Sequence, residues 1–199
     1  MIYLLLGWVL YYTLHSLLAT VWVKNAVAAR WPATPRFYRL AYNQLSVWLF
    51  LLLLRYQISL PDKLVMPSGL VLTISGYALM GGGLLLAILA LRGYSLGEFA
   101  GWAYLRQGAA AADNGLSTKG FNGVVRHPLY LAILVGLGGF FLTAPTLAHL
   151  VFVGCAAAYV LVGTRLEERK LLQRFGVTYA RYRQQVPRLM PRLSRQPKA

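Results

Sequence analysis

The stretch that decides the fold lies in the middle of the chain, where residues 68–91 read SGLVLTISGYALMGGGLLLAILAL. These residues include no charged side chain, and at the rise of an α-helix they extend over about 36 Å. That length suffices to cross the apolar part of a bilayer with some tilt. The stretch therefore predicts a membrane-spanning helix.

Further apolar stretches lie on both sides of this helix. Residues 1–23 hold no charge and lack the basic start of a secretory signal, so they are expected to be a retained span. The last two stretches are separated only by Thr143, Ala144, Pro145 and Thr146, which predicts a tight helical hairpin. The pattern predicts an all-α integral membrane protein, with residues 1–199 as a single domain and five spans at about 1–23, 42–60, 68–91, 128–144 and 145–166.

The composition excludes several classes of protein. Hydrophobic residues make up 58% of the chain and charged residues only 13%, although the formal net charge is +15. A soluble nucleic-acid binder would place such a charge on a polar sequence, so no nucleic-acid partner is expected. The chain has one cysteine, Cys155, which excludes an intrachain disulfide and a thiolate metal cluster.

The basic residues are distributed unevenly along the chain. With the five predicted spans, all of the Lys and Arg residues except Arg55 and Lys63 fall on one side of the membrane. Because basic loops stay in the cytoplasm, the N-terminus is expected outside and the C-terminus inside, in a multi-pass protein of a bacterial inner membrane. The basic tail is expected to bind the lipids of the anionic inner leaflet, and no obligate protein partner is inferred.

Residues 119–130, KGFNGVVRHPLY, form the first candidate functional stretch. Pro128 fits the first turn of a helix, which would leave the amides of Leu129, Tyr130 and Leu131 without intrahelical partners. Arg126 and His127 would stand beside this helix start as donors to a ligand. Alternatively, Arg126 anchors the helix at the membrane border and His127 is an interfacial packing residue.

The second candidate stretch begins with the adjacent acidic residues Glu167 and Glu168 at the inner end of the last span. Their carboxylates could form helical ion pairs, Glu167 with Lys170 and Glu168 with Arg165. Alternatively, they accept hydrogen bonds from the amino group or the ribose hydroxyls of a ligand. Gly176 is expected to end a helix, and the spacing of Tyr179 and Tyr182 places both on one side of the following turn.

The two stretches together resemble the C-terminal signature of a known superfamily. RHPLY at 126–130, followed after the predicted hairpin by LEERKLLQRFGVTYARYRQQVPRLMP at 166–191, is similar to the isoprenylcysteine carboxyl methyltransferase and phospholipid methyltransferase superfamily. HSLLA at 15–19 and YRLAYNQLS at 38–46 resemble its small NnrU-like branch. The resemblance implies a membrane methyltransferase with S-adenosylmethionine in a cytoplasmic pocket formed within residues 119–191. Its acceptor, a small molecule or a lipid, would enter from the bilayer.

The resemblance also implies roles for particular residues. Arg126 is the candidate catalytic residue, expected to steer an anionic acceptor. Gly81 and Gly83 match a Gly-x-Gly of the third span only weakly, and close helix packing explains such small residues better. The expected cofactor contacts, taken together with the helix start, are Phe121, Val125, His127, Leu129, Tyr130, Glu167, Glu168 and Tyr179.

The chemistry of the acceptor stays open at the level of the sequence. Methyl transfer from a sulfonium needs alignment and exclusion of water more than it needs catalytic side chains, so a carboxylate, a thiol or an amine would serve. An NADPH-dependent membrane reductase of the sterol-reductase type shares the Arg-His-Pro-x-Tyr layout, and a non-enzymatic membrane scaffold is a further alternative. Against the reductase, the acidic pair would repel the phosphate of NADPH.

Overall fold

The computed structural model describes residues 1–31, 35–92 and 115–191. Within these residues the chain forms α-helices, one short 3₁₀ helix and an isolated bridge between Leu64 and Thr146, so the predicted all-α fold is confirmed for this part of the chain. Arg106 and the last basic residues of the tail lie outside it. In chain order the elements are α1 (Ile2–Leu18), α2 (Val21–Arg30), α3 (Pro35–Ser59), α4 (Leu70–Leu91), η2 (Gly120–Gly123), α7 (Pro128–Thr143) and α8 (Leu147–Gln185).

The described residues group into two compact units. The first contains 1–31, 35–68 and 144–156, and the second contains 69–92, 115–143 and 157–191. Helix α8 therefore begins in the first unit and continues into the second. The single membrane domain expected from the sequence stays a prediction.

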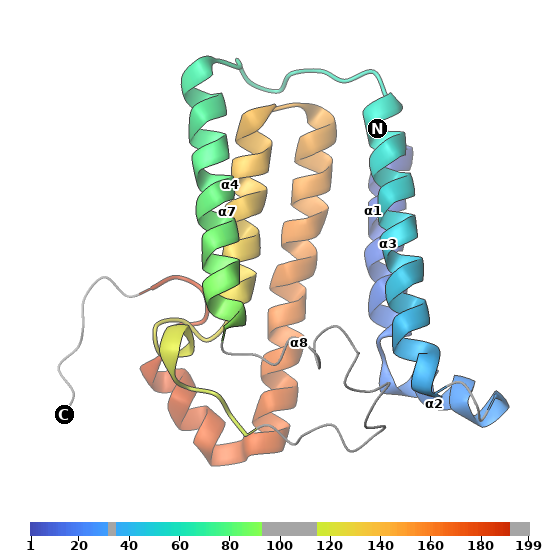
Figure 1. The fold of residues 1–199 in the computed structure, drawn as a ribbon, viewed down its shortest axis with the longest axis vertical. Coiled ribbons are helices and arrows are strands. Elements are labelled where there is room, and N and C mark those ends of the chain that lie inside the picture. Colours follow the sequence, from blue (N-terminus) through green and yellow to red (C-terminus); the bar gives the residue numbers. More distant parts are fainter. Residues whose placement is uncertain (32–34, 93–114, 192–199) are drawn as a thin grey trace. The chain divides into compact units, whose positions relative to one another are not determined.

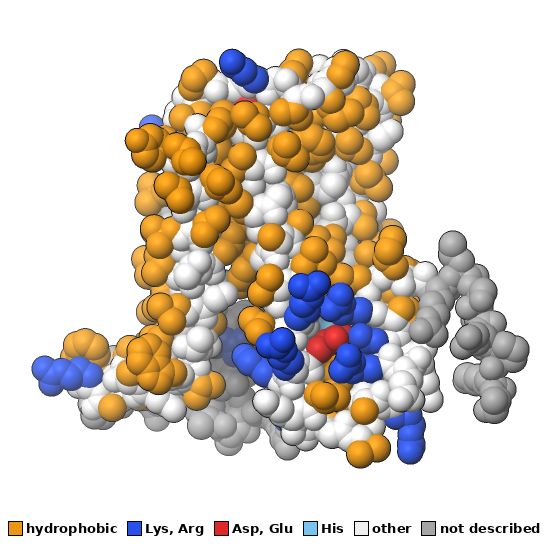
Figure 2. All heavy atoms as spheres, turned by 180° about the vertical axis from the view of Figure 1, so that it is seen from behind, with side chains coloured by type: hydrophobic (Ala, Val, Ile, Leu, Met, Phe, Trp, Pro, Cys, Tyr) orange, Lys and Arg blue, Asp and Glu red, His pale blue; other side chains and the backbone are white. Residues whose placement is uncertain are grey.

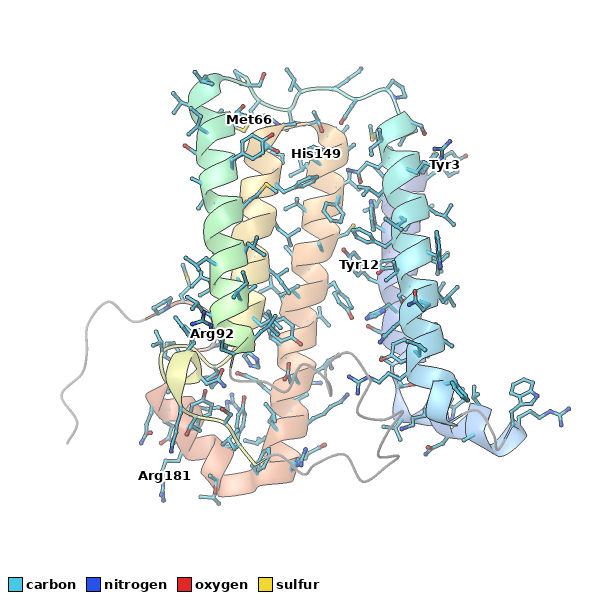
Figure 3. The ribbon with its side chains drawn as sticks, in the orientation of Figure 1. Tyr3, Tyr12, Met66, Arg92, His149 and Arg181 are labelled. Atoms are coloured by element: carbon cyan, nitrogen blue, oxygen red, sulfur yellow. The ribbon has the colours of Figure 1, made fainter. Side chains whose placement is uncertain are left out.

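The first unit is built on helices α1 and α3, which lie side by side (Figure 1). Leu4 and Trp8 of α1 are fully buried together with Ala148 of α8, and Tyr12 packs against them (Figure 3). The indole N–H of Trp8 donates to the side-chain oxygen of Gln57 at 3.1 Å, and both residues are buried. This hydrogen bond satisfies two polar groups that an apolar surrounding would otherwise penalise.

The connection between α3 and α4 caps the start of α8. The Asp62 carboxylate accepts from the backbone amides of Lys63 at 2.9 Å and Ala148 at 3.1 Å. Burial alone would raise the pKa of Asp62, but these bonds and one from the Thr146 hydroxyl lower it. The predicted break at Thr143–Thr146 is confirmed, because α7 ends at Thr143 and α8 begins at Leu147. The Val65 amide donates to the Pro145 carbonyl and the Leu147 amide donates to the Lys63 carbonyl, so this connection lies against the α7–α8 turn.

In the second unit, α4 and α7 pack backbone against backbone (Figure 1). A Cβ atom added at Gly83 would come within 2.8 Å of the Ala132 carbonyl oxygen and the Gly136 amide nitrogen. A Cβ atom at Gly139 would come within 2.6 Å of the Gly76 carbonyl oxygen. Small residues allow this close approach, as is usual between helices in membranes. The packing interpretation of Gly83 is confirmed, whereas a Cβ atom added at Gly81 would meet nothing within 4 Å among the described residues.

Helices α7 and α8 run in opposite directions. Their joined ends are separated by only three residues, and residues just before α7 contact Glu168, far along α8. The rise from Leu147 to Glu168 along α8 is about 32 Å, close to the thickness of the apolar core of a bilayer. The predicted helical hairpin is therefore confirmed, with Glu168 at the end opposite the turn.

In the described part of the chain, three helices are long and apolar enough to cross a membrane, namely Phe37–Ser59, Leu70–Leu91 and Leu147–Gln185. The bent pair α1 and α2, which meet at 64°, would make a fourth if it counted as one span. The bend follows from Thr20, whose hydroxyl accepts from the Val23 amide and starts a new helix. At 16 residues, or about 24 Å, α7 is short for a full crossing. The five predicted spans stay a prediction.

Candidate functional site

The first wall of the candidate site is the segment from η2 to the start of α7. Gly120 has a φ of 62°, which a residue without a Cβ adopts without strain and which starts the 3₁₀ turn. The amides of Val124 and Val125 both donate to the Phe121 carbonyl and close this turn. Val125 is consequently 2% exposed, whereas Phe121 remains 39% exposed.

Helix α7 begins at Pro128, as predicted from the sequence. The prediction for Leu131 was wrong, because its amide donates to the His127 carbonyl at 3.0 Å in the first regular hydrogen bond of the helix. His127 therefore acts as the residue before the first turn, with its carbonyl directed along the helix. Leu129 and Tyr130 are partly buried, and the rings of Tyr130 and His127 lie 5.6 Å apart.

The second wall is the far part of α8. The backbone leaves the helical conformation at Gly176, where φ is 50° and ψ is −124°, so the expected helix break at this residue is confirmed. The segment after the break turns back toward η2 (Figure 1), and Tyr179 and Tyr182 bury their rings there. The Tyr182 hydroxyl donates to the Asn122 carbonyl at 2.5 Å and joins the two walls.

A buried ion pair also joins the two walls of the site to each other. The Arg126 guanidinium donates from Nε to Glu168 Oε1 at 2.8 Å and from Nη2 to the same oxygen, and both side chains are only 8% exposed. Its Nη1 donates to the carbonyl oxygens of Arg183 and Val186, at the end of α8. Arg126 thus holds a buried carboxylate and the last turn of the helix at once. The expected helical ion pair of Glu168 with Arg165 is replaced by this contact across 42 residues.

The backbone at the same place forms a second connection. The Arg126 amide donates to the Pro187 carbonyl at 2.8 Å, and the His127 amide donates to the Arg188 carbonyl at 3.1 Å. Residues 183–188 therefore form a C-terminal strap that binds the segment before α7 through both side-chain and backbone hydrogen bonds. By contrast, the exposed Arg181 projects away from the helix on the same segment (Figure 3).

His127 lies between the two carboxylates of the acidic pair. Its Nε2 is 3.3 Å from Glu168 Oε1, and its Nδ1 is 3.9 Å from Glu167 Oε2. Burial lowers the pKa of His127 below its usual value of 6.5, although Glu167 and Glu168 oppose this shift. A neutral imidazole that donates through Nε2 to Glu168 presents Nδ1 as an acceptor. Two acceptors, Nδ1 and the Glu167 carboxylate, then face one another without a proton between them.

The two acidic residues differ in their surroundings. Burial alone would raise the pKa of Glu168, but the hydrogen bonds and the charge of Arg126, with His127 beside it, lower it. Glu168 is therefore a buried, ionised partner of Arg126. The Glu167 side chain is 44% exposed and makes no direct contact with Arg126 among the described residues. Figure 2 shows acidic side chains ringed by Lys and Arg side chains.

The structure therefore brings most of the predicted site residues together. Arg126, His127, Glu167 and Glu168 form one charged cluster, and Tyr179 lies close enough for Glu168 to raise its pKa in addition to the larger effect of burial. The ring of Tyr130 lies close to that of His127 and so adds to this cluster. Val125, which directly precedes Arg126 in the chain, is buried. The predicted roles of these residues, and those of Phe121 and Leu129, stay predictions.

One polar residue of the site was not predicted from the sequence. Asn122 is 8% exposed, its side-chain amide donates to the Ser117 hydroxyl at 3.3 Å, and its carbonyl accepts from Tyr182. The only local signal was an asparagine between Gly120 and Gly123, a pattern that usually marks an exposed turn. Its burial depends on Tyr182, which lies 60 residues later in the chain.

Within the described residues the chain is all-helical, with three candidate membrane spans and a charged cluster where α8 meets the start of α7. The chain belongs to the family described as "Protein of unknown function (DUF1295)", whose profile matches residues 1–186. No solved structure matches the chain significantly.

Among curated proteins, the matches are named methanethiol S-methyltransferases. One from Bradyrhizobium diazoefficiens is 48% identical over 71 residues, which are 35% of this chain and 26% of that protein. One from Pseudomonas deceptionensis is 38% identical over 91 residues, 45% of this chain and 33% of that protein. The chain thus spans only about a third or less of the length of these relatives. These matches confirm the resemblance to the isoprenylcysteine carboxyl methyltransferase-like group of membrane methyltransferases.

Proposed function

We propose that this protein is an integral membrane methyltransferase that uses S-adenosylmethionine to methylate a small thiol. The observation that carries the proposal is the cluster of His127, Glu167 and Glu168 at the end of an apolar helix. Its residues coincide with the stretch that resembles the methyltransferase superfamily. The names of the curated relatives support both the reaction class and the thiol acceptor.

The polar atoms of the cluster suit the charged end of S-adenosylmethionine. His127 Nδ1 and Glu167 Oε2 are 3.9 Å apart, and both are acceptors when the imidazole is neutral. An ammonium group between them would donate to each, and the carboxylate of Glu167 would offset its charge. Arg126 already donates twice to Oε1 of Glu168 and offsets its charge, so Glu167 is the carboxylate less committed to a partner. The donors and acceptors present therefore fit the cofactor through Glu167 rather than through both acidic residues.

The reaction requires the protein to bind the cofactor and the acceptor and to exclude water. S-adenosylmethionine supplies a methyl group on a positively charged sulfur, which leaves as a neutral thioether. A thiolate acceptor attacks that carbon, so a new C–S bond forms as the old one breaks, and the thiol proton passes to solvent or to a base. In this arrangement His127 Nδ1 would already accept from the ammonium group of the cofactor, so the thiol proton passes to solvent. Arg126 acts here by holding the strap and Glu168 in place.

The acceptor is expected to reach the site from the bilayer. Small thiols and lipids both partition into apolar surroundings, and the cluster lies where the uncharged part of α8 ends. The thiol is preferred over a lipid amine or a prenylcysteine carboxylate because of the relatives' names alone. The reductase alternative is not favoured, because Glu167 and Glu168 would lie beside the phosphate of NADPH. A role as a non-enzymatic membrane scaffold would not explain why a partly exposed carboxylate lies beside a buried neutral histidine.

Binding and turnover measurements on the purified full-length protein test this function. S-adenosylhomocysteine should bind in detergent at micromolar concentrations in calorimetry, whereas NADPH should show no binding. Radiolabelled methyl groups should pass from S-adenosylmethionine to an added alkanethiol, and not to a phospholipid amine or a prenylcysteine. Preferential binding of NADPH would overturn the enzyme class. Binding of S-adenosylhomocysteine with transfer only to a lipid amine or a carboxylate would overturn the choice of acceptor.

A further inference from the structure

Two buried polar atoms in the second unit have no hydrogen-bond partner among the described residues. They are the side-chain oxygen of Asn122 and the hydroxyl of Tyr179. Asn122 is 8% exposed and Tyr179 is 1% exposed. Buried polar groups in folded proteins nearly always have a partner, so each such group points to a missing water, ion or ligand. Tyr179 lies beside the charged pair of Arg126 and Glu168, so the side-chain oxygen of Asn122 is the atom that calls for an explanation.

The two atoms belong to one cluster of side chains. The rings of Tyr179 and Tyr182 lie 5.9 Å apart, and the Tyr182 hydroxyl donates to the backbone carbonyl of Asn122 at 2.5 Å. Val125, close behind Asn122 in the chain, is buried, and Phe121, directly before it, keeps 39% of its surface exposed. The Tyr179 hydroxyl lies within electrostatic reach of Glu168 and Arg126. Asn122, by contrast, contacts the uncharged side chains of Ser117 and Tyr182.

Asn122 is held in a fixed orientation. Its backbone is set by the 3₁₀ turn Gly120–Gly123 and by the bond from Tyr182. Its side-chain nitrogen donates to the Ser117 hydroxyl at 3.3 Å, which leaves the side-chain oxygen as the free end. A neutral, preoriented acceptor in an apolar surrounding selects a neutral donor, because an ammonium group would be desolvated there without a countercharge. Glu167 offers the ammonium group a better partner.

We propose that the side-chain oxygen of Asn122 accepts a hydrogen bond from the exocyclic amino group of the adenine of S-adenosylmethionine, and so selects an adenine nucleoside. This inference rests on the proposed function. Among the groups of that cofactor, the adenine amino group is a neutral donor on a flat apolar ring, and Asn pairs with adenine through this group in other settings. The exposed ring of Phe121 offers a surface on which the base can stack.

The inference predicts that the protein binds a ligand with the adenine amino group more tightly than the same ligand without it. The ratio of the two dissociation constants measures this preference within each variant. The probes are S-adenosylhomocysteine and its 6-deamino analogue, in which hydrogen replaces the adenine amino group. The parent protein should bind the 6-deamino analogue about fivefold to tenfold more weakly in calorimetry, the effect of one lost neutral hydrogen bond. Asn122→Leu should bring the ratio close to one, because the acceptor is gone. Asn122→Asp, which keeps an acceptor of the same shape, should keep the preference.

A ratio is insensitive to a fraction of misfolded protein, and Asn122→Ala provides a second variant if the leucine does not fit. Asn25→Leu is the matched control, since Asn25 is exposed on α2, and its ratio should equal that of the parent. Failure of the parent to bind S-adenosylhomocysteine would overturn the proposed function and this inference with it. Binding of both probes with equal affinity by the parent would overturn the inference alone. An unchanged preference in Asn122→Leu would do the same.

Discussion

The acidic pair shows how two adjacent, chemically identical residues take different tasks. Glu168 is buried and bound to Arg126, whereas Glu167 is partly exposed and faces the free nitrogen of His127. Burying a charge is tolerated only with a partner, so Glu168 needs Arg126 for the fold. Glu167 is partly exposed and needs no buried counterion, so its carboxylate remains available to a ligand.

This division of tasks predicts opposite outcomes for two conservative substitutions. Glu168→Gln should destabilise the protein by on the order of 3 kcal/mol, because it leaves the Arg126 charge buried without a counterion. Glu167→Gln should leave stability nearly unchanged, within about 0.5 kcal/mol, since the side chain is partly exposed. It should weaken S-adenosylhomocysteine binding by about 1 to 3 kcal/mol, as for a lost charge-assisted hydrogen bond. Unfolding in mixed micelles and calorimetry measure the two effects, and a reversed pattern would contradict the assignment.

The pH dependence of stability follows from the same residues. The folded protein lowers the pKa of His127 below 6.5 and that of Glu168 below 4.5. The unfolded chain therefore binds more protons, and the stability contributed by both groups is complete above pH 6.5 and declines as the pH falls. The His127 part is lost first, below pH 6.5, and the Glu168 part only below pH 4.5.

The melting temperature in detergent should accordingly fall between pH 7 and pH 5, and fall further below pH 4.5. His127→Asn should remove the first decrease, and Glu168→Gln should remove the second. An exposed basic residue, Arg181, supplies the control, because Arg181→Ala should leave the profile unchanged. A protein that becomes more stable between pH 7 and pH 5 would rule out the burial of a neutral His127.

The sequence predicted the members of the site better than their pairing. Arg126, His127, Glu167 and Glu168 were all expected near one another, since the resemblance and the hairpin bring their segments together. The partner of Glu168 was expected within its own helix, because spacing along a helix is the only pairing that a sequence displays directly. The actual partner is 42 residues away, and its selection depends on the close packing of the helix start against α8.

At the level of elements, charge-free runs and proline or glycine positions predicted some helix boundaries, but α3 begins at Pro35 rather than near 42 and α8 continues to Gln185 rather than ending near 166. The predicted span at 68–91 differs from α4 by two residues at its start, and Pro128 and Gly176 mark the expected boundaries. The bend between α1 and α2 was not predicted, because residues 1–23 are uniformly uncharged. The cap formed by Thr20 interrupts the helix without any change in hydrophobicity.

The packing of α4 on α7 predicts a sharp difference between neighbouring glycines. Gly83→Ala places a methyl group 2.8 Å from backbone atoms of α7, so the helices must separate, at a cost of about 1 to 3 kcal/mol. Gly82→Ala meets nothing within 4 Å among the described residues and should be neutral or stabilising by up to about 1 kcal/mol. Unfolding in mixed micelles compares the two variants. Equal stabilities would show that α4 and α7 do not touch at this point.

At the level of the whole molecule, the predicted topology places the two ends of α8 on opposite sides of the membrane. In a Cys155→Ser background, a cysteine at the exposed Ser68 should react with a membrane-impermeant maleimide added to intact cells. A cysteine at the exposed Val177 should react only after the membrane is opened, because it lies beyond the basic end of α8. Labelling of both positions in intact cells would contradict a crossing by α8.

The C-terminal strap also has a consequence for how the protein is made. Arg126 and Val186 are 60 residues apart, so the segment before α7 leaves the ribosome well before its partner exists. At about 5 to 20 residues per second, Glu168 follows Arg126 by roughly 2 to 8 s and Val186 follows it by roughly 3 to 12 s, so the strap carbonyls are the last partners to appear. Insertion of the apolar helices can proceed in that time, but the site closes only near the end of synthesis. A chain interrupted after the last apolar helix would therefore be inserted and still lack a binding site.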